Sequence, residues 1–235
     1  MADDDGFLSS FSTDFVQLPQ YKAAGTSAVD FDGLLAPPLK LHEDLAGGCG
    51  GQLWPAGMVL SRYLLRQHAH ALHGRSIVEL GAGGGLVGLA VALGCDAAAS
   101  EKRPLYITDQ APMLALMQRN TALNALAARV RPVVYDWGAA PPPEIPVPPD
   151  VILAADCVYF EPAFPLLRRT LEDLIGPNTV CYFCFKRRRR ADLHFIKAIK
   201  KTFDVQEVLD DPDKDVYARQ NIFLLKITKR KNGTL

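Results

Sequence analysis

Ser76-Ile-Val-Glu-Leu-Gly-Ala-Gly-Gly-Gly-Leu-Val-Gly-Leu-Ala90 is the stretch that decides the fold of this chain. Residues 77–80 predict a short buried strand, residues 81–85 a tight glycine turn, and residues 86–93 the start of a helix. A glycine turn between a strand and a helix lets backbone approach a ligand and directs the helix N-terminus at it. The stretch therefore predicts a nucleotide-type pocket.

Length and composition limit the class of protein. The chain has 235 residues, for which we expect a flexible arm over residues 1–30 and a single α/β domain over residues 31–235. Lys plus Arg and Asp plus Glu number 26 each, so no overall charge favours nucleic acid or a membrane. Because residues 1–5 have neither a basic nor an apolar region, we expect no secretory leader. The sequence has no run of about 18 apolar residues, and its five cysteines suit a reducing compartment. We expect a monomeric cytoplasmic protein, with the nucleus as the alternative location.

Hydrophobic patterns alternate between strands and helices along the rest of the chain. Further strands are expected over residues 106–109, 130–135, 150–155, 179–185, 205–209 and 221–227. Helices are expected over residues 58–72, 113–126, 166–174 and 191–203, and an edge hairpin over residues 31–41. The last two strands are separated by too few residues for a crossover helix, which indicates an antiparallel pair. The pattern predicts a three-layer α/β/α Rossmann-like fold whose seven-stranded sheet is mostly parallel and closes in a C-terminal antiparallel hairpin.

Ligands of such a fold bind at the carboxyl ends of the strands. Asp109 follows the glycines by about 20 residues, where an acidic side chain can hold both hydroxyls of a ribose. Trp137 offers an aromatic face for an adenine, and Asp156 and Tyr159 lie near the reacting end. The strand ends contain no Ser-His-Asp set, no metal-ligand spacing and no lysine of a phosphate-binding loop.

A dinucleotide-binding turn is the first alternative, because residues 83–88 satisfy the pattern G-x-G-x-x-G. Two details oppose it: Glu79 precedes the turn, and the turn begins at Gly81, which places Gly88 inside the helix and too late to contact a pyrophosphate. Simpler interpretations also remain for single residues. Trp54, Trp137 and Tyr159 can be packing residues, and Asp156 can be a helix N-cap.

Several motifs appear together in one order along the chain. They are Leu53-Trp-Pro-Ala56, Glu79-Leu-Gly-Ala-Gly83, Thr108-Asp109, Asn120 with Asn124, Asp136-Trp-Gly138 and Ala155-Asp-Cys-Val-Tyr159. Over residues 50–190 this set resembles the seven-β-strand S-adenosylmethionine methyltransferases, and specifically the family 16 protein lysine methyltransferases with their D-x-x-Y signature. Within that family the chain is most similar to the fungal elongation factor 1-alpha lysine methyltransferases.

The resemblance implies that S-adenosylmethionine is the cofactor and that Asp156 and Tyr159 are the catalytic residues, lining the channel of the target lysine. The implied cofactor-binding residues are Trp54, Glu79, Gly81, Ala82, Gly83, Asp109, Trp137 and Ala155. Elongation factor 1-alpha is the implied protein substrate, with no metal, nucleic acid or membrane as partner. The alternatives are a methyltransferase of another protein, an RNA or a small molecule, a nicotinamide oxidoreductase, and an interaction module without catalysis.

Residues 186–190 are five consecutive cations where many family members carry a glutamate and an arginine. Because cations are unfavourable at a helix N-terminus, we expect an acidic group to face them, and we take it to be an acidic patch on the substrate protein. Cys181 and Cys184 have the spacing of a metal-binding pair but point to opposite faces of a strand, which indicates structural cysteines. His68, His70 and His73 do not share a helix face as metal ligands would.

Overall fold

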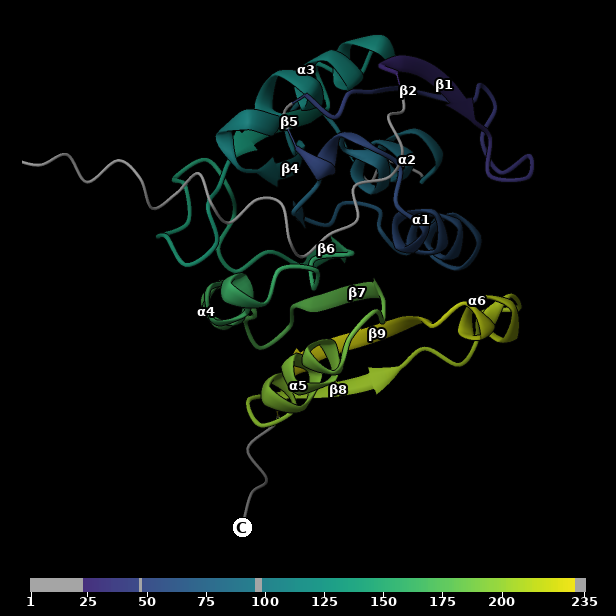
Figure 1. The fold of residues 1–235 in the computed structure, drawn as a ribbon. Helices are drawn as coiled ribbons and strands as arrows, with labels where there is room; N and C mark the ends of the chain where they lie inside the picture. Colours follow the sequence, from purple (N-terminus) through teal and green to yellow (C-terminus); the bar gives the residue numbers. More distant parts are fainter. Residues whose placement is uncertain (1–22, 47, 96–98, 231–235) are drawn as a thin grey trace, which may run out of the picture.

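A seven-stranded sheet forms the centre of the molecule (Figure 1). The structure, a computed structural model, describes residues 23–46, 48–95 and 99–230. The strands lie in the order β5-β4-β3-β6-β7-β9-β8, parallel except that β9 is antiparallel to β7 and β8. Their bounds are β3 (Ile77–Leu80), β4 (Leu105–Asp109), β5 (Val130–Val134), β6 (Val151–Ala155), β7 (Val180–Lys186), β8 (Phe203–Glu207) and β9 (Ile222–Lys229). The predicted sheet and its antiparallel C-terminal pair are confirmed.

Helices on both faces of the sheet complete the three predicted layers (Figure 1). On one face lie α1 (Pro55–Gln67), α2 (Leu86–Gly94) and α3 (Leu114–Leu123), and on the other lie α4 (Phe164–Leu174) and α5 (Arg190–Ile199). The short α6 (Lys214–Arg219) packs on β9, and the 3-10 turns η1 (Cys49–Gly51), η2 (Ala111–Met113) and η3 (Glu161–Ala163) precede α1, α3 and α4. The proline-rich residues 139–149 form a loop between β5 and β6.

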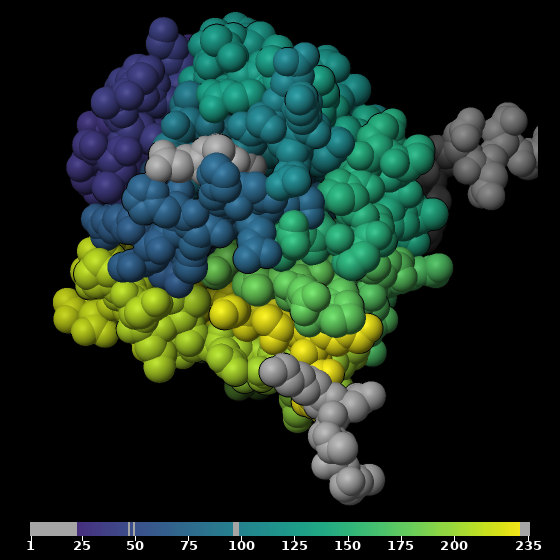
Figure 2. Space-filling view, turned by 180° about the vertical axis from the view of Figure 1, so that it is seen from behind, coloured from purple at the N-terminus to yellow at the C-terminus, as the bar shows by residue number. Residues whose placement is uncertain are grey.

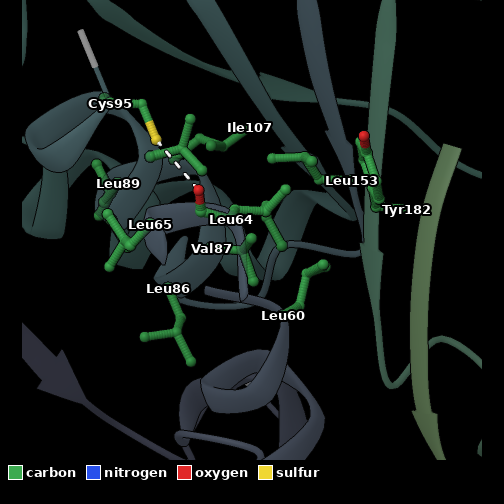
Figure 3. Close-up of a cluster of buried hydrophobic side chains, with 14 of the residues drawn as sticks. Leu60, Leu64, Leu65, Leu86, Val87, Leu89, Cys95, Ile107, Leu153 and Tyr182 are labelled. Carbon is green, nitrogen blue, oxygen red and sulfur yellow. Dashed lines mark hydrogen bonds between the residues drawn. The ribbon is translucent and has the colours of Figure 1, made fainter. Parts of the chain in front are cut away.

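The stretch that decides the fold is buried on both sides. All four residues of β3 are buried, and Ile77 packs with the cluster under α1 and α2, whereas Val78 and Leu80 pack with the cluster under α4 and α5. Figure 3 shows the first cluster, in which leucines of α1 and α2 meet Leu153 of β6 and Tyr182 of β7. Burial on both faces explains why this strand is apolar throughout instead of alternating.

An N-terminal hairpin stands apart from the main sheet. Its strands β1 (Gly25–Val29) and β2 (Leu39–Glu43) pair antiparallel, and Figures 1 and 2 show it at the opposite end of the molecule from β8 and β9. The hairpin begins before residue 31, so the expected boundary between arm and domain at residue 30 falls inside it. Residues 1–22 of the expected arm lie outside the part of the chain that the structure describes.

The end of α5 differs from the sequence expectation of one helix over residues 191–203. The helix stops at Ile199, Thr202 donates its backbone N–H to the carbonyl of Ile199 at 3.0 Å, and Phe203 begins β8 opposite Lys229. Helical periodicity continued to Phe203 because that side chain is buried on the same face as α5. The sheet pairing, which the periodicity does not contain, decides the boundary.

Two asparagines of α3 attach the hairpin to the main fold. Asn120, which is fully buried, accepts the backbone N–H of His42 at 2.7 Å and donates to the carbonyls of His42 at 3.1 Å and Gly84 at 2.9 Å. One turn later, Asn124 makes the same pair of bonds to Lys40, at 2.9 and 2.7 Å. Asn120 therefore joins three separate segments: the hairpin, α3 and the glycine turn.

Replacing Asn120 with Ala is expected to lower the free energy of unfolding by roughly 2–4 kcal/mol, because two buried backbone groups of His42 and the half-buried carbonyl of Gly84 lose their partner. Asn124→Ala is the matched control: its hydrogen bonds to Lys40 are exposed, and a loss of about 1 kcal/mol or less is expected. Urea denaturation of both variants measures the difference. Equal losses would contradict the role assigned to the buried amide.

Candidate active site

A cavity of about 920 Å³ opens at the carboxyl ends of the central strands. At β3 the strand order reverses, since β4 and β5 lie on one side of it and β6 and β7 on the other. Such a reversal separates the loops that follow neighbouring strands and is where α/β folds bind ligands. The cavity is within the size range of small-molecule sites. Its walls include all ten residues predicted from the sequence: Trp54, Glu79, Gly81, Ala82, Gly83, Asp109, Trp137, Ala155, Asp156 and Tyr159.

The glycine turn is the floor of this cavity. Ala82 donates its backbone N–H to the carbonyl of Thr108 at 2.9 Å, which ties the turn to the end of β4. Gly83 has a φ of 55°, and a Cβ placed on it would clash with the carbonyl oxygen of Gly50 in η1. The glycine thus allows both the left-handed backbone and the close approach of a second loop.

Asp109 is held rigidly at the end of β4. Its Oδ2 accepts the backbone N–H of Gly83 at 2.7 Å, and its Oδ1 accepts that of Gln110 at 2.7 Å. Burial raises the pKa of this carboxyl, and the two N–H donors oppose the increase. A carboxylate that is fixed in this way, with acceptor sites remaining, can receive the two hydroxyls of a ribose.

Glu79 lies beneath the N-terminus of α2. Its Oε2 accepts the backbone N–H of Gly88 at 2.8 Å, and the side chain is almost completely buried while still lining the cavity. Burial raises the pKa of Glu79 to about 8, against the opposing effect of the N–H groups of Gly88 and Val87. Gly88 lies within α2 and does not line the cavity, as expected for a turn that begins at Gly81.

The stability of Glu79→Gln relative to the wild-type protein is expected to be greater at pH 9 than at pH 5. In the folded chain the pKa of Glu79 is above its ordinary value, so the wild-type protein loses stability as pH rises from about 4.5 to 8 and the buried carboxyl must ionise. Gln can accept the Gly88 N–H without this ionisation. Urea unfolding measures the free energy of unfolding of both proteins at pH 5 and pH 9. The prediction is contradicted if the wild-type protein gains stability relative to Glu79→Gln between pH 5 and pH 9.

Two tryptophans line the cavity, and both are only half-buried. Trp137 packs over the backbone of the turn, since a Cβ on Gly81 would lie 2.9 Å from its Cζ2. Trp54 occupies the N-cap position of α1, directly before Pro55. Their partial exposure toward the cavity favours ligand-binding roles over the alternative of core packing.

Asp156 has an unusual backbone conformation and three hydrogen-bond donors to its carboxylate. Its φ is 54°, in the left-handed region, and its side chain is 4% exposed. Its Oδ1 accepts the backbone N–H of Lys186 at 2.9 Å and Arg188 Nη1 at 3.1 Å, while Oδ2 accepts Arg188 Nη2 at 3.2 Å. No side chain caps η3 or α4, so the alternative that Asp156 is a helix N-cap is wrong. A carboxylate has about four acceptor sites, and three are used by these donors.

The basic run over residues 186–190 also requires a correction. Its acidic partners include residues of this chain: Arg188 pairs with Asp156, and the backbone N–H groups of Arg188 and Arg189 donate to Asp192 Oδ2 at 2.8 and 2.9 Å. Asp192 is completely buried and forms a capping box with Arg189 at the start of α5. Arg188 and Arg189 line the cavity, so an acidic patch on another protein is not needed to explain their charge.

Tyr159 lies at the edge of the cavity, in the same segment after β6 as Asp156. It is 39% exposed, and its backbone carbonyl accepts a hydrogen bond from Arg189. Phe160 and Leu166 beside it are each 48% exposed and line the same cavity. These three side chains give the opening an apolar rim next to the cations of the β7–α5 loop.

Sequence reasoning missed several residues of this site. Gly50, Glu43, Asn120 and Arg188 line the cavity but received no role there. Glu43 is buried and accepts the backbone N–H of Leu53 at 3.0 Å, which holds the segment that carries Trp54. The cluster of glycines over residues 46–51 was the available signal for the loop above Gly83, whereas no local pattern distinguishes Arg188 from its neighbours in the run.

Comparison with known proteins identifies the family of this chain. A family described as lysine methyltransferase matches residues 35–202. This chain is a member of the lysine methyltransferase family. Protein-lysine N-methyltransferase EFM6 of Saccharomyces cerevisiae is 35% identical to this family member over 88% of the chain and 92% of its own length. Mouse EEF1A lysine methyltransferase 3 is 33% identical over 72% of the chain and 70% of its length, and mouse METTL21A is 36% identical over 72% and 76%.

Solved structures with the same fold are more distant in sequence. The S-adenosylmethionine-dependent methyltransferase SibL is 13% identical with a TM-score of 0.53, covering 74% of this chain and 56% of its own. Aeropyrum pernix fibrillarin bound to S-adenosylmethionine is 16% identical with a TM-score of 0.50, covering 74% and 73%. At these identities the likeness shows the methyltransferase fold alone. The family, the fold and the cavity agree with the predicted use of S-adenosylmethionine by this lysine methyltransferase.

Within residues 23–46, 48–95 and 99–230, no helix is long and apolar enough to cross a membrane. The same residues contain no group of three His, Cys, Asp or Glu side chains that could hold a metal ion. Cys181 and Cys184 are buried in different core clusters on opposite faces of the sheet, so the prediction of structural cysteines is confirmed.

Proposed function

We propose that this lysine methyltransferase transfers a methyl group from S-adenosylmethionine to a lysine of translation elongation factor 1-alpha. The observation that supports this proposal is that one cavity is lined both by the residues assigned to a nucleoside, Asp109 and Trp137, and by Asp156 and Tyr159. The substrate is inferred from the related EEF1A lysine methyltransferase 3, whose name states its target. A cytoplasmic location, in which we expect this chain to act as a monomer, is consistent with such a substrate.

The nucleoside half of the cavity fits the cofactor in shape and chemistry. We assign the ribose hydroxyls to Asp109, the adenine to the face of Trp137, and the methionine part to the backbone of Gly81, Ala82 and Gly83. Glu79 lines the cavity next to that backbone and accepts the backbone N–H of Gly88 in the first turn of α2, and Ala155 offers backbone on the neighbouring strand β6. When bound, S-adenosylmethionine would supply a methyl group on a positively charged sulfur. A neutral lysine amine would attack the methyl carbon, and the sulfur would leave with the electron pair of the broken C–S bond.

The acceptor half of the cavity then has to deliver and orient that amine. We assign this role to Asp156, whose position is fixed by Lys186 and Arg188, and to Tyr159 at the edge. Trp54, which precedes α1, closes the cavity over the sulfur end. Positioning and removal of water account for most of the rate in such a displacement, because the protein forms no covalent intermediate.

The substrate is tested by incubating the purified chain with isotopically labelled S-adenosylmethionine and unmethylated recombinant elongation factor 1-alpha. We expect label on one lysine, located by mass spectrometry, and none after that lysine is replaced by arginine. Adding a lysate from cells that lack the enzyme extends the test to all proteins and RNA. Label on a different protein or on RNA would reject the proposed substrate.

The cofactor is tested separately by equilibrium binding. S-adenosylhomocysteine is expected to bind with micromolar or tighter affinity, and NAD is expected to show no measurable binding. Calorimetry with both ligands decides between them. Tight NAD binding with no binding of S-adenosylhomocysteine would overturn the cofactor assignment.

A further inference from the structure

Arg188 spans the acceptor end of the cavity. Its guanidinium forms two hydrogen bonds with the carboxylate of Asp156 and lies with Cζ 5.2 Å from the centre of the Trp54 ring. Its backbone N–H is anchored on Asp192 at 2.8 Å, so the side chain starts from a fixed point. Arg188, Asp156 and Trp54 all line the cavity. The guanidinium is therefore part of the wall that an incoming lysine meets.

The carboxylate alone is a poor environment for the nucleophile. A free lysine has a pKa of about 10.4, so at neutral pH it arrives as an ammonium ion, and only the neutral amine has the lone pair that attacks a methyl group. An unpaired carboxylate nearby favours the ammonium form and holds its proton. A guanidinium beside the carboxylate opposes that effect, and it stays charged at every working pH.

We propose that Arg188 is a positioning residue that compensates the charge of Asp156, so that the target lysine is held at Asp156 as a neutral amine. The inference rests on the proposed methylation of a protein lysine and deepens it. One acceptor site of Asp156 remains for an N–H of the amine, while the ion pair removes the net negative charge that would retain the proton. The released proton passes to water at the open edge near Tyr159, and no other reactant is required.

Other titratable groups also line the cavity. They are His42 and Glu43 on β2, Glu79 on β3, Asp109 at the end of β4, Tyr135 and Asp136 after β5, Cys157 and Tyr159 after β6, and Arg189 after β7. Cys184 and Lys186 of β7 hydrogen-bond Asp156 through their backbone. Burial, followed by the charges of Asp109 and Asp156, raises the pKa of Cys157 well above its ordinary value, and burial also raises that of Cys184. Both thiols are therefore neutral in the working range, and the guanidinium of Arg189 lies 3.4 Å from the carboxylate of Asp192. Among the groups named here, Arg188 is the cation that pairs with the carboxylate of Asp156.

The pH dependence of kcat tests this role, because kcat reports ionisations in the enzyme–substrate complex. For Arg188→Gln we expect the acid limb of kcat to move up by about one to two pH units, a loss of roughly tenfold to a hundredfold at pH 7.5 that largely recovers near pH 10. Arg188→Lys keeps the charge and is expected to keep the wild-type limb with a smaller, pH-independent loss. Arg190→Gln removes an exposed charge from the same run and should leave the profile unchanged.

Proton release on binding provides a readout without turnover. The complex with S-adenosylhomocysteine is titrated with elongation factor 1-alpha at pH 7.5 in two buffers of different ionisation enthalpy, and again with a target in which the lysine is replaced by methionine. The wild-type protein should release close to one additional proton for the lysine form, since the amine binds neutral, and Arg188→Gln should release much less.

The outcomes separate the two levels of the hypothesis. A pH-independent loss in Arg188→Gln with unchanged proton release would show a merely structural role and overturn the inference alone. A lower KM with unchanged kcat would show that Arg188 blocks the lysine, which also overturns it. A wild-type protein that methylates no protein lysine would reject the proposed function and the role of Arg188 with it.

Discussion

Replacing Asp156 with Asn is expected to reduce kcat for lysine methylation by roughly a hundredfold or more, while the affinity for S-adenosylhomocysteine changes little. The amide removes the charge that pairs with Arg188 and replaces one acceptor oxygen by a donor, so the target amine loses its fixed partner. A displacement of the nucleophile by about 1 Å can by itself cost a hundredfold. The measurement is steady-state methylation together with calorimetric cofactor binding.

Glu161→Gln is the matched control for this variant. Glu161 is an exposed carboxylate five residues later, at the start of η3, and it does not line the cavity. Its activity is expected to equal that of the wild-type protein within about twofold. Thermal unfolding of both variants shows whether the fold is intact. Full activity in a folded Asp156→Asn protein would leave Asp156 with a structural role only.

Gly83→Ala is expected to weaken cofactor binding by at least about tenfold and to lower the free energy of unfolding by roughly 2–4 kcal/mol. The added methyl group meets the carbonyl of Gly50, and the backbone has a positive φ that alanine adopts only with strain. Movement of the turn would also break the hydrogen bond from the Gly83 N–H to Asp109. Binding of S-adenosylhomocysteine and urea unfolding measure the two effects.

Gly33→Ala separates backbone strain from the clash. Gly33 also has a positive φ, of 82°, but a Cβ there would meet nothing within 4 Å. We expect it to lose about 1–2 kcal/mol of stability through strain alone and to bind the cofactor normally. If Gly83→Ala behaved the same way in both measurements, the contact between the glycine turn and the η1 loop would have no part in cofactor binding.

The cofactor half of the site could be predicted because its residues lie next to the elements that place them. Glu79 lies in β3, and Gly81 and Gly83 come directly after it. Asp109 ends β4, and Trp137 follows β5. In a parallel sheet the carboxyl ends of neighbouring strands meet at one edge, so strand assignment alone brings these side chains together. Their presence in one cavity confirms that reasoning at the level of position, while their roles toward the cofactor stay predictions.

The arrangement of the half assigned to the target lysine could not be predicted, because it depends on contacts between segments that are distant in the sequence. Arg188 resembles its neighbours in the sequence, yet the antiparallel pairing of β7 with β9 and the capping of α5 by Asp192 direct it alone to Asp156, 32 residues earlier. The attachment of the hairpin through Asn120 spans 78 residues and likewise leaves no periodic signal. Hydrogen bonds of this kind follow from how the packed elements meet.

The sequence by itself determined the α/β class, the glycine turn within Ser76 to Ala90, and which candidate ligand-binding residues stand at the end of each parallel strand. Strand burial and turn conformation are local consequences of side-chain type. Only the tertiary structure decided that the carboxylate of Asp156 is paired, that Arg188 and Arg189 line the cavity, and that the loop at Gly50 approaches Gly83 closely. The physical reason is that charge compensation and close backbone approach depend on distances between segments that no single stretch of chain contains.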